Sequence, residues 1–102
     1  MLAVTDCTEA LRIAPNDANI MDSRGFAYLR LGQLDDAVAD YDEALRRNPK
    51  QAGSLYGRGL AKLKKGDTTG GEADIAAAKA IQADITEDFA RYGVTPIRAS
   101  AE

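Results

Sequence analysis

The chain repeats itself every 34 residues, and this period constrains the fold more than any other feature of the sequence. A shift by 34 positions, without a gap, superimposes identical residues throughout the chain. The first set of identities consists of Ala3, Val4, Asp6, Glu9, Ala10, Leu11, Arg12 and Pro15, which fall on 37–49. A second set consists of Ala18, Arg24, Gly25, Ala27 and Gly32, which fall on 52–66. Tandem copies of one structural unit are therefore expected, each packed on its neighbour.

Each period contains two helical segments that end at helix-terminating residues. Pro15 precedes the first segment, with Asn16 and Asp17 as capping candidates, and Gly32 ends it as a natural left-handed C-cap. The second segment ends before Pro49, which cannot continue a helix. The helices expected on this basis span 16–31, 35–47, 51–65 and 69–82. Short loops between them make consecutive helices antiparallel.

The ends of the chain depart from the complete period. Residues 2–13 match only its second helix, and 84–92 predict a short closing helix. The fold expected is all-α, a solenoid of about two and a half helix pairs with a C-terminal closing helix. The predicted repeat domain is 1–93, and a C-terminal tail, 94–102, follows it. Within the domain, 1–15 is the second helix of a truncated repeat, 16–49 and 50–83 are full repeats, and 84–93 is the closing helix.

This pattern resembles the tetratricopeptide repeat. The residues that carry the resemblance in the middle repeat are Gly25, Tyr28, Gly32, Ala37, Tyr41, Ala44 and Pro49, with Met21 where the family often has tryptophan. The resemblance implies a superhelix whose concave face is lined by the first helix of each pair and binds a peptide or a partner helix. The peptide-binding residues that it implies are Asn19, Asp22, Ser23, Phe26, Leu29, Arg30, Tyr56, Leu60, Leu63 and Lys64.

Catalytic and metal chemistry find no support in the residue types present. The chain has no histidine and a single cysteine, Cys7, so the usual zinc ligand sets and a cysteine–histidine pair cannot be assembled. Acidic pairs such as Asp35 with Asp36 suit solvated helix surfaces and helix N-termini. We expect no enzyme activity, no metal and no cofactor.

The charge and hydropathy patterns exclude further classes of partner. A net charge of −3 gives no basic patch for nucleic acid or for anionic membrane. No apolar run is long enough to span a bilayer, and Met1–Ala10 lacks the features of a signal peptide, which favours the cytoplasm. The expected partner is a protein or peptide.

Charged residues recur with the period of the repeat. Arg24 and Arg58 fall at equivalent positions, as do the aspartates Asp6, Asp40 and Asp74. One interpretation is a structural series of ion pairs, Arg24 with Asp6 or Asp40 and Arg58 with Asp40 or Asp74, since a buried-side arginine needs a carboxylate. The other is that the arginines hold a ligand carboxylate. The structural interpretation is favoured.

Two features remain open to alternative interpretations. Gly53 and Gly57 lie one turn apart, and either admit a ligand backbone or simply weaken their helix. The helix at 2–13 lacks the helix that would pair with it, so Val4, Cys7 and Leu11 are expected to leave an apolar stripe that seeks cover. The alternative function is therefore self-assembly, with a two-fold homodimer as the expected form. Cys7 also occupies the core position of Tyr41 one period later.

Overall fold

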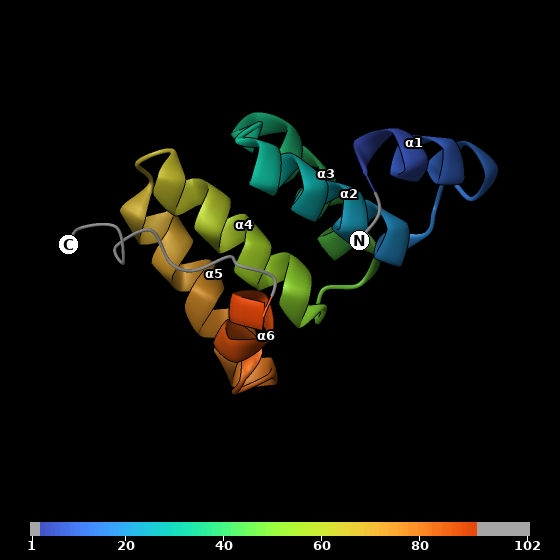
Figure 1. Cartoon of the computed structure of the whole chain (residues 1–102). Coiled ribbons are helices and arrows are strands. Elements are labelled where there is room, and N and C mark those ends of the chain that lie inside the picture. Colours follow the sequence, from blue (N-terminus) through green and yellow to red (C-terminus); the bar gives the residue numbers. More distant parts are fainter. Residues whose placement is uncertain (1–2, 92–102) are drawn as a thin grey trace.

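The computed structural model describes residues 3–91, which fold into six α-helices and contain no strand. The helices are α1 (Val4–Ile13), α2 (Ala18–Leu31), α3 (Leu34–Arg47), α4 (Ala52–Lys64), α5 (Thr68–Ile81) and α6 (Ile85–Arg91) (Figure 1). The predictions of an all-α solenoid and of a closing helix are confirmed. The predicted tail 94–102 lies outside the described residues, and the division of the chain into repeats stays a prediction. No described helix has the length and apolar character needed to cross a membrane.

Local hydrogen bonds and backbone geometry explain where α2 begins and ends. The Asp17 carboxylate accepts bonds from the backbone N–H groups of Asn19 and Ile20, at 2.9 Å and 3.2 Å, and so caps the helix N-terminus. Gly32 ends the helix with φ of 80°, and Gly66 adopts φ of 95° one period later. Glycine takes this left-handed conformation without the steric penalty of a Cβ atom.

The helices pack as successive antiparallel pairs (Figure 1). α2 pairs with α3 and α4 pairs with α5, while α1 packs on α2 and α3 on α4. The second pair approaches most closely at Gly59 and Gly71, where a Cβ on either glycine would lie 2.8 Å from the backbone oxygen of the other. Small residues at this crossing therefore set the distance between the two helices.

The ring of Tyr41 joins one helix pair to the next. It is fully buried and lies between Gly25 of α2 and Gly57 of α4. A Cβ on Gly25 would lie 3.0 Å from Cε1 of the ring, and a Cβ on Gly57 would overlap Cζ and the hydroxyl oxygen. Gly57 therefore serves packing, because the ring from the preceding repeat fills the space that a side chain would take.

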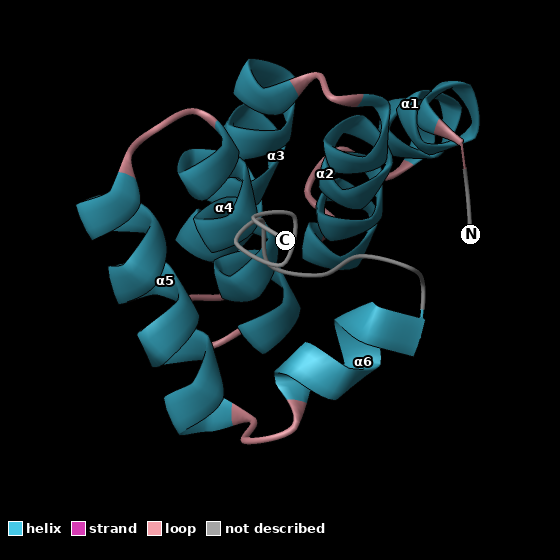
Figure 2. Ribbon diagram, turned by 60° about the vertical axis from the view of Figure 1, so that its left-hand side comes forward, coloured by secondary structure: helices cyan, strands magenta, loops and turns pink. Residues whose placement is uncertain are grey.

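The last helix, α6, lies across the helix pairs instead of extending their stack. It follows α5 and packs on α4 and α5, and it reaches below α2 in Figure 2. Phe89 on α6 contacts Phe26 on α2, with ring centroids 5.4 Å apart. By the 34-residue period, Phe89 is equivalent to the buried residues Met21 and Leu55. α6 thus continues the register of the repeats while contacting both earlier helix pairs.

The two neighbouring glycines of α4 give a matched test of the Tyr41 contact. Gly57→Ala should destabilise the chain by about 1–3 kcal/mol, because the buried ring of Tyr41 has no space to move into. Gly53→Ala should stabilise it by up to about 1 kcal/mol through helix propensity, since its Cβ would meet only Asp22, at 3.6 Å. Urea unfolding measures both changes. Equal effects of the two substitutions would contradict the packing role of Gly57.

Candidate functional site

An aromatic cluster lies where α6 meets α2 and α4. The ring of Phe89 packs edge-on against Phe26, at an interplanar angle of 81°, and tilted against Tyr56, with centroids 4.6 Å apart. Tyr56 is fully buried and Phe89 is 9% exposed. We call the surface formed by Asp22, Phe26 and Tyr56 the α2–α4 face. Because aromatic pairs of this geometry are favourable beyond their buried area, Phe89 is the anchor that holds α6 on this face.

The structure corrects part of the peptide-binding set that the resemblance implied. Leu29, Tyr56 and Leu60 belong to the buried core and are not free surface. Tyr56 is covered by Phe89, a contact that no pattern within α4 could reveal. Leu63 is turned towards α5, where its side chain sits against the position of Gly71. The other members stay predictions: Asp22, Ser23 and Phe26 are half-buried, and Asn19, Arg30 and Lys64 are exposed.

Asp22 lies on the α2–α4 face one helical turn before Phe26. Its carboxylate accepts a hydrogen bond from the Ser54 hydroxyl of α4, at 2.8 Å. Burial raises the pKa of Asp22, and the Ser54 hydrogen bond only partly opposes this rise. Within residues 3–91 no ion pair includes Asp22. Asp22 is therefore a desolvated carboxylate to which the described part of the chain brings no cation.

Two tyrosine hydroxyls are buried beside this face. Neither Tyr41 nor Tyr56 makes a hydrogen bond through its hydroxyl to another described residue. The pKa of Tyr41 is raised well above its ordinary value, by burial first and then by the negative charges of Asp22 and Asp40. The hydroxyl of Tyr41 therefore stays protonated and is a donor in the same region as the Asp22 carboxylate.

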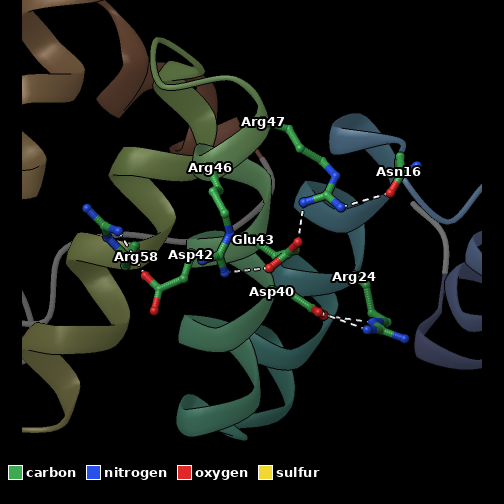
Figure 3. Close-up of polar contacts among 8 residues, drawn as sticks. All are labelled: Asn16, Arg24, Asp40, Asp42, Glu43, Arg46, Arg47 and Arg58. Carbon is green, nitrogen blue, oxygen red and sulfur yellow. Dashed lines mark hydrogen bonds and ion pairs between the residues drawn. The ribbon is translucent and has the colours of Figure 1, made fainter.

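Arg24 links three helices through its guanidinium group, and Figure 3 shows its contact with Asp40. Its Nε and Nη2 donate to the two carboxylate oxygens of Asp40 on α3, at 2.7 Å and 2.8 Å. Its Nη1 donates to the hydroxyl of Thr8 on α1, at 3.1 Å. The side chains of Arg24 and Asp40 are only 24% and 10% exposed. A bidentate pair of this kind fixes the orientation of both partners.

Arg58 repeats the same arrangement one period later. It donates to both carboxylate oxygens of Asp74, at 2.8 Å and 2.9 Å. It also donates to Asp42 on the preceding helix, at 2.8 Å (Figure 3). Burial alone raises the pKa of Asp74, but hydrogen bonds from Arg58 and Lys62 outweigh this and lower it overall. Asp74 therefore contributes stability above its unfolded pKa, and that contribution is lost as the pH falls through its lowered folded value.

These contacts identify the partners of the arginines that recur with the period of the repeat. Arg24 pairs with Asp40 and Arg58 with Asp74, so each arginine bonds the aspartate sixteen positions later. Asp6 is exposed and joins none of the ion pairs among the described residues. Both guanidinium groups are engaged within the chain, which leaves the ligand-carboxylate interpretation without support.

The predicted self-association stripe on α1 is only partly exposed. Cys7 is fully buried because α2 covers it, so its assignment to a contact surface is wrong. Val4 and Leu11 are half-buried, and Ile13 is 73% exposed. Burial is the largest influence on the Cys7 thiol and raises its pKa, which keeps it protonated and unreactive. In the described part of the chain no acidic or cysteine cluster could hold a metal ion.

Several residues of the site were not singled out from the sequence. Phe89 carried a signal, since it falls on the period of Met21 and Leu55. Thr8 and Asp42 also lie 34 residues apart, and each receives the third bond of an arginine. Ser54 had no signal, because its importance comes from Asp22 on the neighbouring helix.

Comparison with known families agrees with this architecture. A family model described as "TPR repeat" matches residues 25–66, and one described as "Tetratricopeptide repeat" matches 7–39. Together the matches run from α1 to the loop that follows α4. No curated protein matches the sequence.

The Arg24–Asp40 pair should stabilise the fold more than an exposed pair does. Replacement of either residue by alanine should destabilise by about 1–3 kcal/mol, because the remaining charge is left partly buried. A double-mutant cycle followed by urea unfolding should give a coupling of about 1 kcal/mol or more. The exposed pair of Arg12 and Glu9 is the control, and its coupling should be much smaller because solvent screens both charges. Additive effects of Arg24→Ala and Asp40→Ala would show that the pair does not stabilise the fold.

Proposed function

Because the chain belongs to the tetratricopeptide repeat family, we propose that it mediates protein–protein interaction by binding a peptide or partner helix on the α2–α4 face. Tetratricopeptide repeats are generally protein–protein interaction modules, and the family is typically non-enzymatic. The proposal concerns the particular surface and the kind of segment that it receives.

The observation that carries this proposal is that the face already receives a helix of the same chain. α6 inserts the ring of Phe89 against Phe26 and Tyr56, and the burial of Ile85 accompanies this contact. A surface that accepts one short apolar helix edge has the shape and chemistry to accept another. Aromatic side chains are also the commonest anchors of protein interfaces.

Charged side chains beside the aromatic cluster would orient a bound segment. The Arg30 guanidinium lies 6.0 Å from the centre of the Phe26 ring and is exposed. Asp22 lies on the other side of Phe26, one turn earlier on α2. Opposite charges at the two ends of an apolar patch favour one direction of binding over the reverse.

Self-assembly is a second candidate, supported by the position of α1. Among the described helices α1 packs only on α2, and Ile13 at its end is exposed. The outer side of an end helix in a solenoid is normally covered by a polar cap. Another copy of the chain could cover the part of Val4 and Leu11 that remains accessible.

Peptides selected on the wild-type chain from a random display library test the first candidate. We expect enriched peptides whose affinity, measured by calorimetry, falls at least about tenfold in Phe26→Ala, because truncation of an aromatic anchor removes a hot spot. Glu72→Ala, an exposed change on α5, is the control and should bind normally. Thermal unfolding must show that both variants are folded. Absence of enriched peptides, or equal binding by Phe26→Ala, would reject the α2–α4 face.

The second candidate predicts a dimer at tens of micromolar protein. Light scattering coupled to size exclusion measures the mass directly. Changing Val4 and Leu11 together to glutamate should return the protein to a monomer, because two charges cannot be buried there unpaired. A wild-type monomer would reject self-association through α1, and a dimer that survives the double change would place the contact elsewhere.

A further inference from the structure

α6 is held on the α2–α4 face by few side chains. The helix has seven residues, and Ile85 and Phe89 are its buried ones. Isolated helices of this length are not stable in water, so α6 owes its conformation to this contact. Short elements with little buried area open locally at a small fraction of the global unfolding free energy. Release of Phe89 would remove its ring from its contacts with Phe26 and Tyr56 while the helix pairs stay folded.

Asp22 lies beside the same aromatic site, and no described residue supplies it with a counter-charge. Its partner in the described chain is the Ser54 hydroxyl, and burial raises its pKa. Residues four apart on a helix share a face, so Asp22 and Phe26 are neighbours on α2. Gly53 on α4 faces the same carboxylate, because a Cβ at this position would lie 3.6 Å from Oδ1 of Asp22. Since glycine has no side chain, the space beside Asp22 stays open. A cationic side chain would therefore meet a desolvated carboxylate with space next to it.

The residues of α6 do not supply this cation. Its charged residues near Phe89 include the acidic pair Glu87 and Asp88. The arginine of the helix, Arg91, is exposed and pairs with Asp88, at 2.6 Å. α6 therefore covers the aromatic rings of the site but brings no cation to the Asp22 carboxylate. A ligand that satisfies both would have the advantage in competition for the face.

We propose that α6 is a displaceable occupant of the α2–α4 face, and that the segment replacing it carries an aromatic anchor and a lysine or arginine that pairs with Asp22. This rests on the proposed function and specifies the chemistry of the partner. The aromatic ring takes the place of Phe89 between Phe26 and Tyr56. The cation pairs with the Asp22 carboxylate, and binding is coupled to release of α6.

Synthetic peptides with the sequence of residues 82–91 and capped ends are suitable probes. A single lysine is placed in turn at position 86, 87, 88, 90 or 91, and glutamine replaces Arg91 in every peptide except the one that carries its lysine there. Each has a twin with glutamine in place of the lysine. For the full wild-type chain we expect at least one lysine peptide to bind about tenfold more tightly than its twin, because a charged hydrogen bond forms with Asp22.

Asp22→Asn should reduce that advantage to less than about twofold, because the amide retains the Ser54 hydrogen bond and removes the charge. Asp36→Asn, a change of an exposed carboxylate on α3, is the matched control and should keep the tenfold ratio. Equal binding of every lysine peptide and its twin would overturn the assignment of a cation to Asp22, as would an advantage that persists in Asp22→Asn. Display-selected peptides that bind without lysine preference would leave the proposed function standing.

Release of α6 can be followed separately, because the chain contains no tryptophan. In Phe89→Trp the indole should emit at short wavelength while packed on Phe26 and Tyr56, and shift to longer wavelength when the best lysine peptide binds. Ala90→Trp, on the exposed side of the same helix, should emit at long wavelength throughout. Peptide binding without a shift of the indole emission in Phe89→Trp would overturn displacement, and so would failure of all the peptides to bind.

Discussion

The arrangement of the helix pairs depends on the packing of the Tyr41 ring against Gly25 and Gly57. The ring belongs to α3 and is enclosed by α2 and α4, so it fixes the relative positions of three helices at once. Phe26 and Tyr56 lie on two of those helices, so the contact of Tyr41 helps to set their relative positions. Close packing makes this contact specific, because a Cβ on Gly57 would overlap the ring and a Cβ on Gly25 would be in tight contact with it.

The periodic arginines add a second layer of order. Arg24 and Arg58 each bond two helices: the second helix of their own pair and the helix that precedes the pair. The same guanidinium nitrogens make the equivalent bonds in both repeats. Paired charges of this kind contribute to the uniqueness of the packing as well as to stability. Asp22 differs from them, since the described chain provides it with a hydroxyl and no cation. Asp40 and Asp74 therefore belong to the ion pairs of the fold, whereas Asp22 is available to a cation of a partner.

The sequence predicted the helices, including the closing helix, but not the course of α6. Breakers and caps such as Asp17, Gly32 and Pro49 act within a few residues, so the helix ends fall close to their expected positions. The course of α6 depends on contacts between Phe89 and residues more than thirty positions away, which no local signal encodes. For the same reason, the packing of Gly57 against Tyr41 was not predicted from the sequence. The tyrosine that requires the glycine belongs to the preceding repeat.

Both proposals depend on the occupation of the α2–α4 face by α6, the last helix among the described residues. Nuclear Overhauser effects in the isotope-labelled full chain test it directly, because they report proton pairs that lie close together in space. We expect cross-peaks from the ring protons of Phe89 to those of both Phe26 and Tyr56, whose ring centres lie 5.4 Å and 4.6 Å from its own. Cross-peaks from Phe89 to side chains of α5 alone, with none to Phe26, would show that α6 does not cross the face.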